Sequence, residues 1–194
     1  MRKIARADVK NILEYERVRG EFRRRIIDLK KGRRVTVGSL ITLVFENRDT
    51  VLFQIEEMMR AERIVEEERI KEEIATYNAL IPNADELSAT LLIEITDLKK
   101  IKPTLNRLMG LDQGDRVWIQ FGNEQVYGAF EEGRSTEDKI SAVHFLRFEF
   151  TTQQSRRFRS GEDRVFLHID HPSYKRKTTV PDEVLTNLRE DLEP

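Results

Sequence analysis

The sequence predicts an α+β fold in which N-terminal helices pack on a mixed or antiparallel β-sheet. Residues 1–82 are dominated by apolar side chains three or four positions apart, which is the spacing of amphipathic helices, with one short hairpin at 35–46. Residues 83–194 alternate β-branched and aromatic runs with helical patterns, which is typical of a sheet carrying helices. The stretch 83–87 is the expected boundary between the two regions, which can also form one integrated domain.

The first helix is expected over residues 8–31. Asp8 can cap its N-terminus, Lys30 and Lys31 suit the negative end of the helix dipole, and Gly32 can adopt the left-handed conformation after it. The apolar stripe that predicts this helix consists of Ile12, Tyr15, Val18, Phe22, Ile26 and Leu29.

Two short strands, 34–37 and 40–46, and then more helix are expected to follow. Asp49 or Thr50 can cap the first turn of this helix. The apolar periodicity changes near Arg63, so either a second helix or a bent continuation of the first is expected to run from there until Pro82 stops it.

The second half is expected to fold in the order β-α-β-β-β-α-β. Thr151 and Gln154 form a capping-box pattern, and Gly161 can close the helix that the box begins. This order resembles a ferredoxin-like split βαβ arrangement with one extra strand. The expected strands are 89–95, 116–121, 125–130, 140–150 and 164–170, the helices are 97–110, 152–160 and one after Pro181, and a polar loop covers 131–139.

Charge is distributed unevenly along the chain. Residues 1–34 contain thirteen Lys and Arg against five Asp and Glu, a net charge of +8, whereas the whole chain carries −1. A basic segment of this kind is expected to meet negative charge, either on a partner or on the acidic stretch at 56–73.

Composition excludes several classes of protein. The absence of cysteine removes disulfides, thiolate metal sites and cysteine nucleophiles. No run of 18 apolar residues and no cleavable leader is present, so a cytoplasmic location is expected.

The three histidines suggest one possible site. His168 and Asp170 are expected on one face of a strand, with His171 at its end, and His144 would converge with them if its strand were a parallel neighbour. Such a cluster could hold zinc or iron, or could act as an acid-base pair. The alternative is that the histidines are neutral, hydrogen-bonded core residues.

Charged residues after the hairpin suggest a second site. Arg48 and Asp49 lie between an apolar strand and an apolar helix, and Glu57, Arg60 and Glu62 follow on that helix. They are candidates for binding a ligand, and the structural alternative is an Arg48 ion pair, an Asp49 helix cap and ion pairs along the helix.

Four blocks of sequence resemble a known family. They are ENRDTVLFQIEEMMRAERI, YNALIPNADELSATLLIEI, HFLRF and HIDHPSY, at 46–64, 77–95, 144–148 and 168–174. The family is an uncharacterised bacterial one, a domain of unknown function numbered three-five-zero-one. The resemblance implies a role near rubrerythrin-like and iron-sulphur oxidoreductase proteins, and it supplies no established active site.

Three functions are therefore open. The first is an accessory protein that binds a partner, plausibly a redox protein, through its charged helices. The second is a metal-binding protein or acid-base enzyme that uses the histidine cluster. The third is nucleic-acid binding through the basic first helix. The amphipathic helices also predict a homo-oligomer.

Overall fold

The computed structural model describes residues 1–136 and 139–192. Residues 137–138 of the polar loop predicted at 131–139, and residues 193–194 at the end of the predicted 83–194 region, lie outside the described residues.

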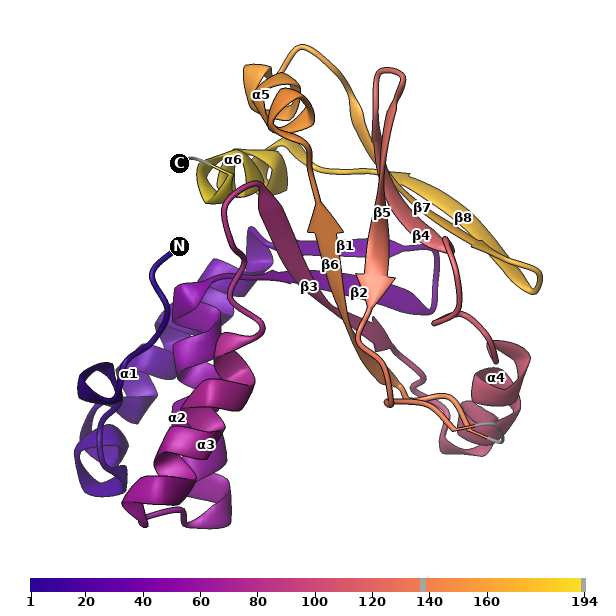
Figure 1. Ribbon diagram of the computed structural model, residues 1–194. Helices are drawn as coiled ribbons and strands as arrows, with labels where there is room; N and C mark the ends of the chain where they lie inside the picture. The colour runs from indigo at the N-terminus through magenta and orange to yellow at the C-terminus, as the bar shows by residue number, and fades with distance from the viewer. Residues whose placement is uncertain (137–138, 193–194) are drawn as a thin grey trace.

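The described chain forms helices and one curved sheet (Figure 1). The helices are α1 (Ile12–Lys31), α2 (Arg48–Glu62), α3 (Glu67–Asn78), α4 (Ile101–Arg107), α5 (Thr152–Ser160) and α6 (Asp182–Asp191), with 3-10 helices η1 (Arg6–Asp8) and η2 (Leu98–Lys100). The strands are β1 (Arg34–Val37), β2 (Ile41–Glu46), β3 (Glu86–Ile93), β4 (Val117–Phe121), β5 (Glu124–Phe130), β6 (Val143–Glu149), β7 (Val165–His171) and β8 (Tyr174–Thr179).

The eight strands form one sheet in the order β1-β2-β3-β6-β5-β4-β7-β8, and every pair of neighbours is antiparallel. The sheet curls until its two edge strands touch, so that it forms a near-barrel. The fold is therefore α+β, with strands from both predicted regions in a single sheet, because β2 pairs with β3.

The ferredoxin-like arrangement is not confirmed. A split βαβ unit requires two parallel strands with one strand between them, whereas β3 and β4, which flank α4, are antiparallel and are separated in the sheet by both β6 and β5. Strand β8 was also missing from the prediction. Its residues, YKRKTT, are mostly charged or polar because β8 lies at the edge of the sheet, where most of its side chains, though not the buried Tyr174, face solvent.

The sheet separates two apolar clusters. The larger one fills the inner face, where Leu108 after α4, Phe158 of α5 and Leu188 of α6 pack on strand residues. The smaller one lies among the N-terminal segment, α2 and α3, with α1 packed alongside through residues such as Phe22. The helices α1, α2 and α3 thus gather on one side of the sheet, and α5 and α6 lie near one end of it (Figure 1). No helix in the described part of the chain is long and apolar enough to span a bilayer.

Helix α1 begins later than predicted. Its cap is Asn11, whose side chain accepts a hydrogen bond from the Glu14 N–H, whereas Asp8 lies in η1 and accepts from the Ala5 N–H. At the other end, Gly32 has φ −77° and is not left-handed.

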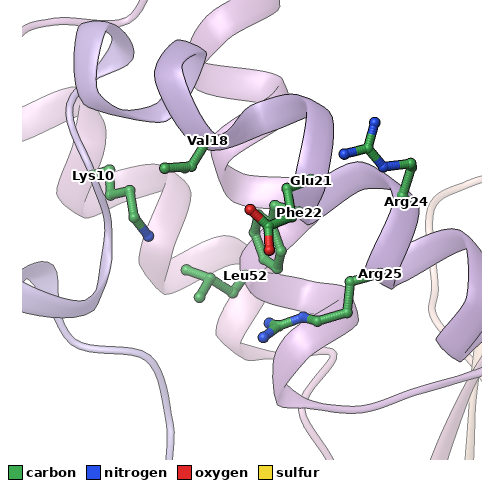
Figure 2. Close-up of a pocket in the computed structure, with 7 residues that line it drawn as sticks. All are labelled: Lys10, Val18, Glu21, Phe22, Arg24, Arg25 and Leu52. Atoms are coloured by element: carbon green, nitrogen blue, oxygen red, sulfur yellow. The ribbon is translucent and has the colours of Figure 1, made fainter.

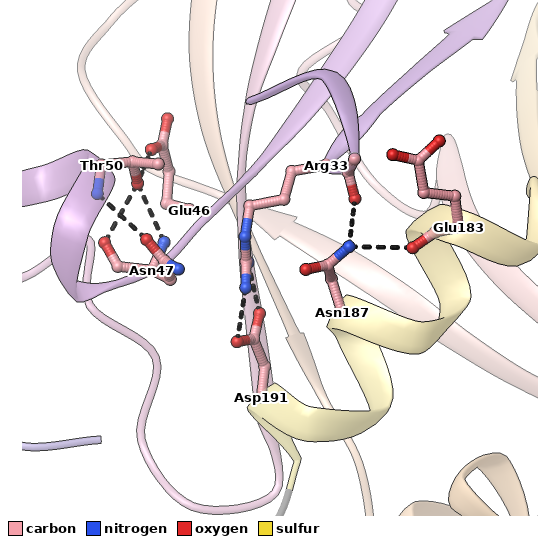
Figure 3. Close-up of polar contacts among 8 residues, drawn as sticks. Arg33, Glu46, Asn47, Thr50, Glu183, Asn187 and Asp191 are labelled. Carbon is pink, nitrogen blue, oxygen red and sulfur yellow. Dashed lines mark hydrogen bonds and ion pairs between the residues drawn. The ribbon is translucent and has the colours of Figure 1, made fainter. Parts of the chain in front are cut away.

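The cap of α2 is Asn47, not Asp49 or Thr50. The Asn47 side chain accepts a hydrogen bond from the Thr50 N–H. The Thr50 hydroxyl donates a hydrogen bond of 2.5 Å to the buried Glu46 carboxylate (Figure 3). The break predicted near Arg63 is confirmed, since Arg63 has φ 55° and separates α2 from α3.

A buried ion pair ties α6 to the start of the sheet. Arg33 donates to both carboxylate oxygens of Asp191, at 2.6 and 2.8 Å, and Asn187 donates to the Gly32 carbonyl beside it (Figure 3). Both charged side chains are at least 95% buried. A bidentate geometry offsets part of the cost of removing these charges from water.

Candidate functional site

The condition under which His144 would converge with His168, that their strands are parallel neighbours, is not met. His144 lies on β6 and His168 on β7, and β5 and β4 lie between these strands in the sheet. Although α5 connects β6 to β7 in the chain, these two strands are therefore not parallel neighbours in the sheet.

His171 faces the inside of the sheet, opposite to His168 and Asp170. The burial of β7 alternates, so that His171 is buried while the other two side chains are partly exposed on the outer face. The Nδ1 atom of His171 accepts from the Ser173 N–H at 3.2 Å, which leaves Nε2 as the donor to the Met109 carbonyl at 2.9 Å. This histidine is therefore a hydrogen-bonded core residue.

His144 is also buried on the inner face. Its Nε2 lies 2.8 Å from the Ser141 carbonyl, to which it donates, and its Nδ1 lies 3.9 Å from the Asp112 carboxylate. Burial lowers the pKa of His144, and the Asp112 charge opposes this effect. Asp112 lies in a loop far from His144 in the chain, so no local sequence pattern connects the two residues.

His168 and Asp170 share the outer face, as predicted, but they do not form a hydrogen-bonded pair among the described contacts. Asp170 forms an ion pair with Lys175 at 2.8 Å, and His168 stacks on Trp118 with 4.6 Å between the ring centroids. Burial lowers the pKa of His168, and Lys177 lowers it further. Across residues 1–136 and 139–192, no three His, Asp or Glu side chains come together in a way that could hold a metal ion.

The second set of candidate residues holds the helices together. Arg48 pairs with Asp8 at 2.8 Å, and Asp49 pairs with Arg25 of α1 at 3.7 Å. The remaining contacts are those of Glu57 with Arg19 and Tyr15, Arg60 with Glu16, and Glu62 with Arg69. The ion pairs expected along α2 itself are thus replaced by pairs with neighbouring helices.

Two surface pockets contain chemically distinctive groups. The first, of about 480 Å³, lies between α1 and α2. In Figure 2, Lys10 and Arg25 lie on either side of Phe22 and Leu52, and both cations lie within 6 Å of the Phe22 ring centroid. Val18, Arg24 and the carboxylate of Glu21 complete the lining.

The second pocket is a groove of about 330 Å³ on the outer face of β4, β7 and β8. Trp118 and His168 line it, together with Asp170 and three cations from β8: Lys175, Arg176 and Lys177. Sequence reasoning missed Trp118 and these cations. The alternation of VWIQF does place Trp118 on the outer face, but the polar sequence of β8 gave no strand signal.

The basic first helix is only partly balanced by carboxylates of this chain. Lys10 before it, and Arg19 and Arg25 within it, pair with Glu56, Glu57 and Asp49 of α2. Four further cations of α1 have no carboxylate within 4.0 Å in the described residues: Arg17, Arg23, Arg24 and Lys30. Of these four cations, Arg24 lines the α1–α2 pocket.

Comparisons with known proteins place the chain in a family. Among curated proteins, no sequence matches it. A crystal structure at 1.90 Å of a novel protein of unknown function from Burkholderia pseudomallei K96243 is 33% identical, with a TM-score of 0.91, over 99% of this chain and 100% of that one. The family described as "Protein of unknown function (DUF3501)" matches residues 3–192. The chain therefore belongs to the DUF3501 family.

Proposed function

We propose that this protein is a non-catalytic accessory protein that binds an acidic, amphipathic segment of a partner protein in the α1–α2 pocket. The observation that carries this proposal is the pocket itself, which combines an apolar floor, Phe22 and Leu52, with cations at its edge. Its volume of about 480 Å³ lies within the usual range of binding pockets.

The pocket suits an apolar anchor flanked by carboxylates. An apolar side chain can displace water from Phe22 and Leu52, while Arg24, which has no carboxylate within 4.0 Å among the described residues, can pair with an acidic neighbour. The redox protein that the family resemblance implies would, in this proposal, supply that acidic segment.

Helix α1 itself supports an interaction surface. Of its twenty residues only Tyr15 and Ile26 are fully buried, and Leu13 is 76% exposed. Val18 and Ile27 are also exposed. These exposed apolar side chains, on a helix that already packs against α2, are available for a second contact.

Charge favours a different protein over a second copy as the occupant. Two copies that met through α1 would bring Arg17, Arg23 and Arg24 of each chain close to those of the other. Like charges in such an interface oppose association, whereas an acidic partner neutralises them.

A panel of labelled amphipathic peptides tests the proposal. Each peptide has a Leu or Phe anchor flanked by Glu, and its matched peptide has Gln in place of Glu. Fluorescence anisotropy should show binding of the acidic peptides only, with weaker binding as salt rises. Arg24→Glu should weaken binding at least tenfold, as should Val18→Asp, which places a charge beside the apolar floor.

Arg23→Glu is the matched control, because it makes the same change of charge on the same helix outside the pocket lining. An equal loss of peptide binding in Arg23→Glu and Arg24→Glu would show that only the net charge of the helix matters, and it would overturn the proposal. So would failure of every acidic peptide to bind. A stable dimer in light scattering that Arg24→Glu dissociates would assign the surface to a second copy.

A further inference from the structure

A row of four side chains crosses the outer face of the sheet. Tyr127 on β5 pairs in register with Trp118 on β4, Trp118 with His168 on β7, and His168 with Lys177 on β8. With neighbouring strands about 4.8 Å apart, the row spans roughly 14 Å, which is longer than a single planar ring.

The rings of this row contact one another. Trp118 and His168 are stacked, with 4.6 Å between centroids and 11° between planes, and Trp118 and Tyr127 are 5.8 Å apart. Phe166 is the next outward residue of β7, and its ring centroid lies 6.5 Å from that of His168. The Lys177 ammonium lies 3.8 Å from the Phe166 ring centroid. Aromatic rings therefore form a continuous surface.

This surface faces solvent. Tyr127 is 41% exposed, and the side chains of Lys175 and Lys177 on the neighbouring edge strand are exposed as well. The helices α1, α2 and α3 belong to the separate apolar cluster and do not line the groove beside the row.

Lys177 gives this face a positive charge at the end of the row. The groove also contains Lys175, which pairs with Asp170, and Arg176, which is in register with the inward-facing Ile169 and lies over the Tyr174 ring. Cross-strand aromatic pairs by themselves stabilise a sheet, but sheet stability does not require a cation in line with them.

Two nitrogens of the row also lack hydrogen-bond partners. The Trp118 Nε1 and His168 Nε2 atoms are buried within the row and have no partner among the described atoms. A buried polar group without a partner lowers stability, so packing alone does not account for the choice of these two side chains. Burial lowers the pKa of His168, which favours the neutral ring, and a neutral ring offers both a donor and an acceptor.

We propose that the row Tyr127, Trp118 and His168, with the cations of β8, binds single-stranded nucleic acid. Aromatic side chains that stack on bases, next to cations that track phosphates, are what such binding requires. Solvent-facing amides are present too, since Gln120 and Gln125 lie in the adjacent register row. This surface is separate from α1, so the inference does not depend on the proposed partner pocket.

Trp118 provides the readout, because it is the only tryptophan in the chain. Unlabelled single-stranded U10 and T10 should quench its fluorescence in a saturable manner, and salt should weaken the effect. The matched duplex should leave the emission unchanged, since paired bases cannot stack on the row. The mononucleotide UMP should bind more weakly, because it engages only part of the row.

Two surface variants test the contacts. Tyr127→Ala should weaken binding of U10 by roughly 5- to 150-fold, the loss expected for one stacked base. Lys177→Glu should also weaken it and reduce the salt dependence. Arg24→Glu on α1 is the control and should bind U10 like the original protein, which also separates this site from the pocket between α1 and α2.

Four results would overturn the proposal. They are the absence of quenching by both oligonucleotides, quenching that survives Tyr127→Ala combined with Lys177→Glu, loss of binding in Arg24→Glu instead, and UMP binding as tightly as U10. The last result would assign the row to a free nucleotide. Circular dichroism of each variant confirms that a loss of binding is not a loss of fold.

Discussion

The hydroxyl of Tyr174 donates a hydrogen bond of 2.6 Å to the carbonyl of Val37, 137 residues away in the sequence. The same hydroxyl accepts from the Leu40 N–H at 3.1 Å. Tyr174 begins β8 and Val37 ends β1, so one buried side chain joins the two edges of the sheet.

Removing that hydroxyl should open the contact between the edges. We expect Tyr174→Phe to lower the free energy of unfolding by about 1–3 kcal/mol, because the carbonyl of Val37 loses a partner in a buried place. Urea denaturation measures the loss. Tyr127→Phe is the control, since the Tyr127 hydroxyl donates to Gln125 at the exposed surface of the sheet. Equal stability of Tyr174→Phe and the original protein would show that the edges are held by packing alone.

The buried pair of Arg33 and Asp191 should be costly to break. Arg33→Met leaves the carboxylate of Asp191 without its partner, and we expect a loss of about 3–5 kcal/mol in the free energy of unfolding. Combining it with Asp191→Leu should restore much of the loss, because no charge then remains buried. Lys31→Met, which removes an exposed pair with Asp28, should change little. Additive losses in the double variant would argue against this account.

Acid should weaken the fold through His144. Burial lowers the pKa of His144 in the folded protein below its ordinary value of 6.5. Between the folded pKa and the unfolded pKa, the unfolded chain therefore binds more protons than the folded one. Stability should therefore be retained above about pH 6.5 and fall as the pH drops through that window. His144→Gln, which keeps a donor for the Ser141 carbonyl, should show a smaller loss of urea midpoint between about pH 7.5 and about pH 5.5.

The comparison between the two proteins isolates His144 from other groups that titrate nearby. His168 also has a lowered pKa, and burial raises that of Glu56. An identical pH dependence in His144→Gln would assign the effect to those groups instead.

Glu57 should control how firmly α1 is attached. Its carboxylate accepts from the Tyr15 hydroxyl at 2.7 Å and from Arg19 at 2.6 and 3.0 Å. In Glu57→Ala these donors lose their acceptor, and amide hydrogen exchange in α1 should accelerate by roughly 10- to 150-fold. Glu62→Ala, on the same helix but paired with α3, should leave exchange in α1 unchanged. Acceleration in both variants would contradict a specific role for Glu57.

Local features of the fold could be predicted from sequence. The capping box of Thr151 and Gln154 is confirmed, as are the left-handed Gly161 and the apolar residues of α6, Val184 and Leu188. Each depends on neighbours within a few residues. The pairing of the strands could not be predicted, because it depends on which distant strands meet. Asn47 was not predicted as the cap because both Asn47 and Asp49 have suitable side chains. Which of them caps α2 depends on where the backbone changes from extended to helical, and this happens at Asn47.

The candidate sites were predictable only in part. Alternation along β7 correctly placed His168 with Asp170 and showed that neighbouring positions face opposite ways. The partners of these residues come from other strands: Trp118 from β4 and Lys175 from β8. Because these contacts depend on strand order, no local pattern reveals them.

The strand order also has a consequence for the time course of folding. The hairpins β1–β2, β4–β5 and β7–β8 join neighbouring segments, and such hairpins form within microseconds. Pairing of β3 with β6 must instead bring Leu92 to Val143, 51 residues later, and contacts of that range are slow to form. The three hairpins would therefore be early units, and the long-range pairings, such as that of β3 with β6, would form later.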